Sequence, residues 1–86
     1  MTTQEKLLKR LHIIEGQVRG VREMIEKKKY CIDVITQTSA IRNALSSIED
    51  SLMESHLDTC VIDQIKKGKE KTTKDEILKV YKLKRK

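Results

Sequence analysis

The chain is 86 residues long and carries a formal net charge of +6, from 19 Lys and Arg against 13 Asp and Glu. Its hydrophobic and charged fractions are equal at 37%, its aromatic fraction is 2%, and it contains no Pro and three Gly. This composition excludes collagen-like, disordered and turn-rich β classes, leaves no room for a sheet-based enzyme, and predicts an all-α chain. Because a domain this small buries only about two-thirds of its unfolded surface, we expect oligomerisation, a metal or disulfides to stabilise it.

The first predicted helix runs from about residue 3 to residue 29. Its apolar residues recur at alternating steps of four and three, a heptad pattern typical of a long helix packed against other helices. This seam consists of Leu7, Leu11, Ile14, Val18, Val21 and Ile25. The start of the helix is less well marked, because Thr3 is followed three residues later by Lys6 and not by an acid.

The second predicted helix follows a break at residues 27–30 and runs from about residue 31 to residue 67. No Gly or Pro interrupts these 37 residues. The heptad seam continues through Val34, Thr38, Ile41, Leu45, Ile48, Leu52 and Ser55. A helix of this length spans roughly 55 Å, which is too long for a globular monomer of this size. It therefore indicates an elongated bundle made by several chains.

The third predicted helix is short and runs from about residue 74 to residue 84. Gly68 is a natural stop for the preceding helix. Thr73 and Glu76 form the pattern T-x-x-E, which is typical of a capping box at a helix start. We expect the three helices to form a single domain over residues 1–86.

Charge is distributed unevenly along the chain. The net charge is +4 over residues 1–30, −5 over residues 31–65 and +7 over residues 66–86. A basic helical chain indicates nucleic acid or an anionic membrane surface as its partner, and the two cationic ends favour phosphate contacts. The sequence shows no signal peptide and no stretch long enough to span a membrane, so we expect a cytoplasmic, reducing setting. In that setting two cysteines are expected to be ligands or redox-active thiols.

The motif S-H-L-D-T-C is the most informative local feature, because it places His56 and Cys60 four residues apart. On a helix this spacing can chelate one metal ion. Cys31 is the other candidate ligand, but it precedes His56 by 25 residues, or roughly 37 Å along a continuous helix. One chain cannot bring all three to one ion. Two antiparallel chains can join Cys31 of one to His56 and Cys60 of the other, which gives two identical sites per dimer.

Two thiolates and one imidazole form a soft, three-coordinate ligand set that suits Cu(I), whereas structural Zn(II) normally requires a fourth ligand. Two other interpretations of the cysteines remain open. They can be buried apolar thiols, or they can form a disulfide or polysulfide bridge between chains that senses oxidation or reactive sulfur. The chain has no Gly-rich phosphate loop, zinc-protease motif or nucleophile elbow, so we do not expect an enzyme.

Three motifs together resemble the CsoR/RcnR/FrmR family of bacterial repressors, and the resemblance covers nearly the whole chain. They are R-L-x-x-I-E-G-Q-V-R-G at 10–20, Y-C-x-D-V-I-T-Q at 30–37 and S-H-L-D-T-C at 55–60. The resemblance implies three helices per chain and an antiparallel dimer that forms a four-helix bundle. It also implies a disc-shaped tetramer, a dimer of dimers, without a helix-turn-helix motif.

The resemblance is greatest to the copper-sensing CsoR subtype. It implies that Cys31, His56 and Cys60 bind Cu(I), and that Tyr30 and Glu76 contact the ligated histidine. The nickel/cobalt subtype resembles a Cys-His-His set, whereas residue 60 here is Cys. The persulfide-responsive subtype keeps both thiols but typically lacks the histidine, so His56 favours copper.

These observations lead to the hypothesis of a homotetrameric repressor that binds double-stranded operator DNA and is released from it by Cu(I). The candidate DNA contacts are Lys9, Arg10, Arg19 and Arg42, and Arg42 is the sole basic residue between residues 31 and 65. No membrane partner or small-molecule substrate is expected. One alternative is a persulfide-responsive, CstR-like repressor that uses its two cysteines. A less favoured alternative is a metal buffer that does not bind DNA.

Overall fold

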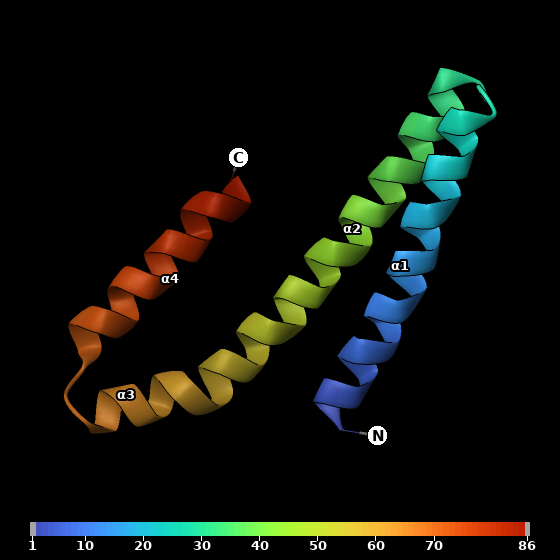
Figure 1. Ribbon diagram of the computed structural model, residues 1–86. Coiled ribbons are helices and arrows are strands. Elements are labelled where there is room, and N and C mark those ends of the chain that lie inside the picture. Colours follow the sequence, from blue (N-terminus) through green and yellow to red (C-terminus); the bar gives the residue numbers. More distant parts are fainter. Residues whose placement is uncertain (1, 86) are drawn as a thin grey trace. The chain divides into compact units, whose positions relative to one another are not determined.

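The computed structural model describes residues 2–85, and every regular element within them is helical. The elements are α1 (Thr3–Glu26), α2 (Cys31–His56), a π-helical segment η1 (Leu57–Val61), α3 (Ile62–Lys66) and α4 (Glu70–Arg85) (Figure 1). The predicted all-α class is confirmed, with α2, η1 and α3 following one another as the predicted second helix. None of the helices in the described residues is long and apolar enough to cross a membrane.

The chain divides into two compact units, with the boundary between Ser51 and Leu52, inside α2. Each unit is described by itself below. The assignment of the whole chain to a single domain therefore stays a prediction.

The first unit begins with a capped helix start that the sequence pattern at Thr3 did not predict. Thr2 is the N-cap of α1, and its Oγ1 accepts a hydrogen bond from the Glu5 backbone N–H at 3.1 Å. Thr2 and Glu5 form the T-x-x-E pattern one residue earlier than the pair we considered. Because the Thr2 oxygen satisfies a backbone donor that the first turn of helix leaves unpaired, it fixes where α1 begins.

The end of α1 comes three residues earlier than predicted, at Glu26. Lys28 adopts a left-handed backbone conformation, with φ of 54°. The Lys29 N–H donates to the Met24 carbonyl at 2.9 Å, and the Lys28 N–H donates to the Ile25 carbonyl at 3.1 Å. Together these bonds close the helix end in the manner of a Schellman motif. The chain can then reverse direction before α2.

The core of the first unit lies between α1 and α2. It contains Leu7 and Ile14 from α1 and Ile41 and Ile48 from α2, each 9% exposed or less. Leu11, Val21 and Ala44 pack against this cluster. These residues belong to the predicted heptad seams or to the apolar stripe beside them, so part of each predicted seam forms the contact between α1 and α2.

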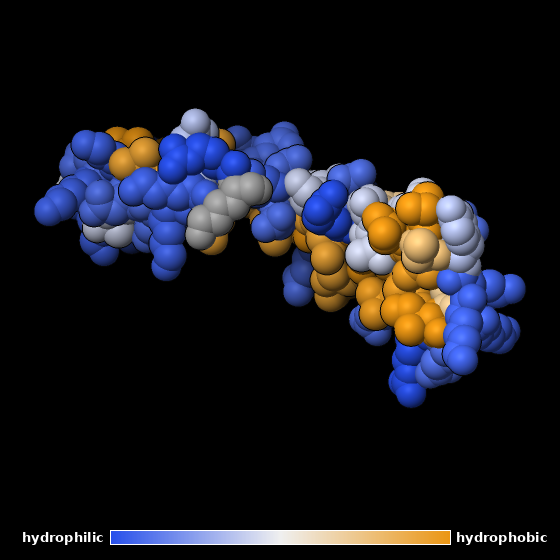
Figure 2. All heavy atoms as spheres, turned by 90° about the horizontal axis from the view of Figure 1, so that it is seen from above, coloured by the Kyte–Doolittle hydropathy of each residue, from blue (hydrophilic) through white to orange (hydrophobic). Residues whose placement is uncertain are grey.

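The same hairpin also exposes many large apolar side chains. Figure 2 shows apolar atoms in orange over the part formed by α1 and α2. The exposed residues are Leu8, Ile13, Val18 and Ile25 on α1, and Ile32, Ile35 and Leu45 on α2. Large contiguous apolar patches on small proteins are typical of interaction surfaces.

The second unit contains one departure from the predicted continuous helix. Leu57–Val61 are π-helical and not α-helical, and regular α-helix resumes at Ile62. π-helical turns widen the helix locally and occur frequently at functional sites. Gly68, with φ of 73°, follows α3 and confirms the predicted stop.

The last helix begins at Glu70, four residues before the predicted start, so the predicted capping box at Thr73 and Glu76 is wrong. The Thr73 N–H already donates to the Lys69 carbonyl at 3.1 Å. The Thr73 hydroxyl donates to Oε1 of Gln64 at 2.6 Å, so a tertiary contact uses the group that the cap required. Thr73, Ile77 and Val80 are the least exposed residues of α4.

Candidate metal centre

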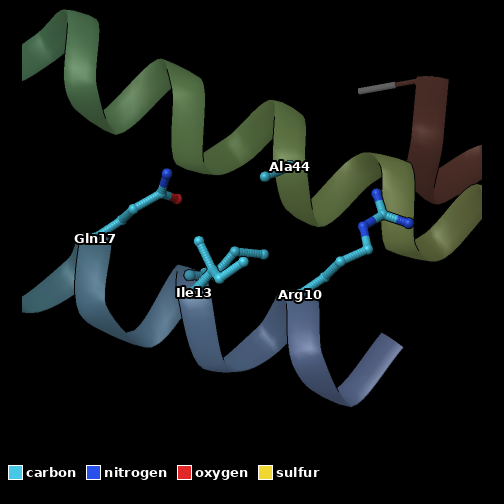
Figure 3. Close-up of a pocket in the computed structure, with 5 residues that line it drawn as sticks. Arg10, Ile13, Gln17 and Ala44 are labelled. Atoms are coloured by element: carbon cyan, nitrogen blue, oxygen red, sulfur yellow. The ribbon is translucent and has the colours of Figure 1, made fainter. Parts of the chain in front are cut away.

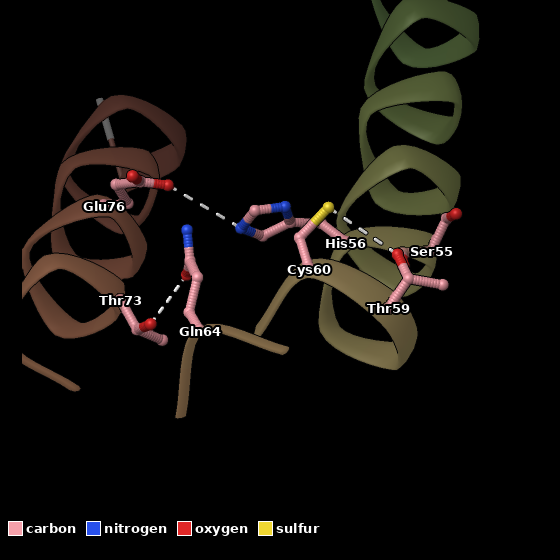
Figure 4. A network of polar contacts seen from close by, with 7 residues as sticks. All are labelled: Ser55, His56, Thr59, Cys60, Gln64, Thr73 and Glu76. Carbon is pink, nitrogen blue, oxygen red and sulfur yellow. Dashed lines mark hydrogen bonds and ion pairs between the residues drawn. The ribbon is translucent and has the colours of Figure 1, made fainter. Parts of the chain in front are cut away.

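His56 and Cys60 lie beside each other in the second unit (Figure 4). His56 is the last residue of α2, and Cys60 lies in the π-helical segment. The His56 side chain is 27% exposed, whereas Cys60 is an exposed free thiol. The Thr59 hydroxyl donates to the Ser55 carbonyl at 2.8 Å and lies 3.7 Å from the Cys60 sulfur. The structure therefore places an imidazole and a thiol side by side, as the S-H-L-D-T-C motif predicted.

Glu76 approaches the imidazole of His56 from α4. The distance between Nε2 of His56 and Oε2 of Glu76 is 3.8 Å, and the Glu76 side chain is 49% exposed. The carboxylate of Glu76 therefore faces Nε2, and Nδ1 is the ring nitrogen that remains open to a metal ion. Figure 4 shows this orientation, with Nε2 directed at Glu76 and Cys60 beside the ring.

Cys31 and Tyr30 belong to the other end of α2. Cys31 is the first residue of α2 and is an exposed free thiol. Tyr30 precedes it, is 67% exposed, and accepts hydrogen bonds at its carbonyl from the N–H groups of Asp33 and Val34. With a rise of about 1.5 Å per residue, Cys31 and His56 are separated by about 37 Å along the helix.

The structure thus brings His56, Cys60 and Glu76 together within the second unit, whereas Cys31 and Tyr30 belong to the first unit. Among residues 2–85, no group of three or more His, Cys, Asp and Glu side chains is placed to hold a metal ion. One chain supplies two of the three predicted ligands at one place. Cys31, the third predicted ligand, belongs to the other compact unit.

The four predicted DNA contacts differ in their surroundings. Lys9, Arg19 and Arg42 are exposed. Arg10 is half-buried, and its guanidinium donates to the Ser47 Oγ at 2.5 Å. The Arg10 side chain therefore points toward α2 as well as toward solvent.

Arg10 also lines a small pocket between α1 and α2 (Figure 3). The other lining residues are Ile13, Ile14, Gln17 and Ala44. Oε1 of Gln17 is buried there and has no hydrogen-bond partner in the described residues. Sequence reasoning identified neither Gln17 nor Ser47 as a contact of this region, because the pairing of α1 with α2 decides which polar groups meet.

The chain resembles known repressors over nearly its whole length. The profile of the family described as metal-sensitive transcriptional repressor matches residues 3–83. The copper-sensing transcriptional repressor CsoR of Bacillus subtilis is 39% identical over 79 residues, which cover 92% of this chain and 78% of that protein. The copper-sensing transcriptional repressor RicR of Mycobacterium tuberculosis is 50% identical over 68 residues, covering 77% of this chain and 71% of that protein.

A solved structure shows the same fold. The crystal structure of the copper-sensing repressor CsoR with Cu(I) from Geobacillus thermodenitrificans matches with a TM-score of 0.87 at 43% identity. The match covers 95% of this chain and 85% of that chain. These findings confirm the resemblance seen in the sequence motifs, and they agree with a regulator and not with an enzyme. The chain belongs to the family of metal-sensitive transcriptional repressors.

Proposed function

We propose that this chain is a transcriptional repressor that binds operator DNA when metal-free and leaves it on binding Cu(I). The observation that carries the proposal is the juxtaposition of the His56 imidazole and the Cys60 thiol, with Glu76 at the far nitrogen of the ring. Its relatives named above are copper-sensing repressors, and a solved relative is described with Cu(I). Because a repressor acts where the chromosome lies, we propose a cytoplasmic location.

The proposed ligands are Cys31 of one chain and His56 and Cys60 of a second chain. Their chemistry fits Cu(I), because two thiolates and one imidazole are soft donors that a low-coordinate monovalent ion prefers. Both thiols are free and exposed, so neither is committed to a disulfide or a core. The rise of α2 keeps Cys31 away from its own His56, so the site requires two chains.

The assembly that supplies the second chain is proposed to be an antiparallel dimer whose α1 and α2 helices form a four-helix bundle. Two dimers then form a tetramer. The support is the set of exposed apolar residues on the hairpin of the first unit, which includes Ile32 at 52% and Ile35 at 59% exposure. In an antiparallel two-fold dimer each chain buries this surface against the other, and the symmetry creates two identical metal sites.

The signal is proposed to pass from His56 to α4 through Glu76. A metal ion held by His56 would withdraw electron density from the imidazole, so the ring would become a stronger hydrogen-bond donor toward Glu76. The stronger attraction of Glu76 would draw α4 toward His56. Tyr30 of a second chain is proposed as a further contact of the same imidazole. By linkage, DNA binding must weaken Cu(I) binding by the factor by which Cu(I) weakens DNA binding.

The DNA surface is proposed to include Lys9, Arg19 and Arg42, whose exposed charges can contact phosphates of double-stranded DNA. Arg10 is proposed to contribute as well, although part of its hydrogen-bonding capacity is used by Ser47. Any contact it makes with phosphate must share or replace that bond.

An anaerobic Cu(I) titration against DNA from the chain's own promoter tests the proposed function. We expect one Cu(I) per chain and a loss of DNA binding at the same stoichiometry. His56→Ala should leave metal-free DNA binding unchanged but blunt the copper response, whereas Ser55→Ala on the neighbouring position should behave like wild type. Copper binding without any change in DNA affinity would contradict the proposal.

The second candidate is a repressor that responds to persulfide. The exposure of both thiols favours it, because a reactive sulfur species can reach each of them. After treatment with an organic polysulfide, whose sulfane sulfur accepts the two electrons and leaves as sulfide, mass spectrometry would then show a crosslink between Cys31 of one chain and Cys60 of another. Cu(I) would have no effect on DNA binding. A metal buffer without DNA binding would instead show no salt-dependent shift of promoter DNA.

A further inference from the structure

Two polar contacts join α4 to the helix that carries the metal ligands (Figure 4). One is the approach of Glu76 to His56 at 3.8 Å, and the other is the hydrogen bond from the Thr73 hydroxyl to Oε1 of Gln64 at 2.6 Å. His56, Cys60 and Gln64 follow one another at steps of four residues, so the metal ligands and Gln64 lie along one side of their helix. Thr73 and Glu76 lie three residues apart on α4, which places them on neighbouring turns of one face.

The two contacts differ greatly in strength. Thr73 is 5% exposed and is the one buried polar residue in the described part of the chain. Its hydrogen bond to Gln64 is short and partly buried, so it costs more to break than a fully exposed one. The contact between His56 and Glu76 is longer than a hydrogen bond, and its partners are 27% and 49% exposed.

The apolar contact between α4 and α3 is partly open to solvent. The faces of the two helices leave an apolar groove lined by Val61, Ile65, Glu70, Thr73, Lys74, Ile77 and Leu78. Val61 is buried, but Ile65 is 50% exposed and Leu78 is 42% exposed. Loose apolar contacts of this kind allow one helix to slide along another, whereas a hydrogen bond between two named atoms defines a single register.

We propose that Gln64 and Thr73 are positioning residues that fix where α4 lies along the axis of α3. They thereby hold Glu76 opposite His56. This inference rests on the proposed metal-sensing function, in which the contact between Glu76 and His56 carries the signal. Figure 4 shows the amide nitrogen of Gln64 on the side on which Glu76 lies. Gln64 therefore lies between its own hydrogen bond to Thr73 and the contact of Glu76 with His56. Loss of the Thr73 hydroxyl releases α4 from its register without removing a metal ligand or a charge.

The matched pair Thr73→Val and Thr73→Ser tests the proposal. Valine keeps the shape of threonine but lacks the hydroxyl, whereas serine keeps the hydroxyl. Both variants should bind one Cu(I) per chain and should retain metal-free DNA affinity. We expect Thr73→Val to reduce the ratio of metal-free to copper-bound DNA affinity by about tenfold, and Thr73→Ser to keep the wild-type ratio.

A second measurement tests, in the metal-free protein, whether Glu76 still lies beside the His56 imidazole. Proton–nitrogen correlation spectra of the His56 imidazole report which ring nitrogen carries the proton. In Thr73→Val we expect the His56 signals to move toward those of Glu76→Gln, in which the carboxylate is absent. Thr73→Ser should give the wild-type spectrum, and Gln64→Leu should reproduce the effect of Thr73→Val.

Wild-type His56 signals in Thr73→Val would overturn the proposal, and so would equal shifts in the valine and serine variants. These spectra need neither copper nor DNA. If the wild-type chain fails to respond to Cu(I), the proposed function fails, while the spectra still decide whether Gln64 and Thr73 position Glu76.

Discussion

Mixing two variants that each lack part of the metal site should rebuild copper binding. In the proposed homodimer, Cys31→Ser removes one thiol from both sites, and a chain with His56→Ala and Cys60→Ser lacks the other two proposed ligands. In a mixed dimer, one site receives Cys31 from the second variant and His56 with Cys60 from the first, so it is complete. The other site has no ligand. The reason is geometric, because Cys31 and His56 lie about 37 Å apart along one helix.

Random pairing of equal amounts makes about half of the dimers mixed, and each mixed dimer has one complete site. We therefore expect about one quarter of a Cu(I) per chain in the mixture, against about one per chain for wild type. The assay refolds the two variants together and titrates Cu(I) anaerobically against a chelator that removes weakly held metal. The separate variants are the controls and should bind no Cu(I) in its presence.

Two results would refute this reasoning. If the mixture binds no more Cu(I) than the separate variants, the site does not form across two chains from these three residues. If Cys31→Ser alone binds one Cu(I) per chain as tightly as wild type, Cys31 is not a ligand. In either case the arrangement inferred from the length of α2 is wrong.

Three further substitutions test the core, the assembly and the DNA surface. Ile48→Ala removes a side chain that is 6% exposed and should lower the free energy of unfolding by about 2 kcal/mol in urea titrations. Ile35→Glu changes a residue that is 59% exposed in the chain, so it should leave the helices intact but dissociate the assembly in sedimentation experiments. Arg42→Gln should reduce the slope of log affinity for DNA against log salt by about 0.9 for each phosphate that the protein no longer neutralises.

Each of these substitutions has a control or a contrary outcome. The exposed Asn43→Ala on the same helix should change the stability by less than about 0.5 kcal/mol, and a similar cost for both variants would argue against a core centred on Ile48. An Ile35→Glu protein of unchanged mass would show that this face is not the interface. Arg42→Gln should retain one Cu(I) per chain, and an unaltered salt slope would remove Arg42 from the DNA surface.

The predicted helices were largely correct because their signals are local. A heptad pattern without Pro identifies which residues form a helix and which of its faces is apolar, and Gly68 reaches the positive φ that ends one. The errors occurred where local signals competed. Thr2 and Thr73 both begin a T-x-x-E pattern, yet only Thr2 caps a helix, because the hydroxyl of Thr73 is bonded to Gln64.

The candidate site was likewise predictable only in those parts that depend on local sequence spacing. The pair of His56 and Cys60 could be found from its spacing, and the side chains do lie together. The π-helical turn that carries Cys60 was not predicted, because no residue pattern at positions 57–61 distinguishes it from an α-helix. Glu76 was associated with His56 only through resemblance, since 20 residues separate them and no periodicity connects two different helices.

The sequence by itself determined the helical class, the positions of the main breaks and the soft character of the candidate ligands, because each depends on residue type and on spacing within one element. Only the tertiary structure decided which residues of each heptad seam are buried within the chain, and that Arg10 turns to Ser47. It also decided that the Thr73 hydroxyl bonds to Gln64 and that Glu76 approaches His56. The physical reason is that these contacts join residues from different helices, and their register depends on how side chains pack between the helices and not on the order of residues along either one.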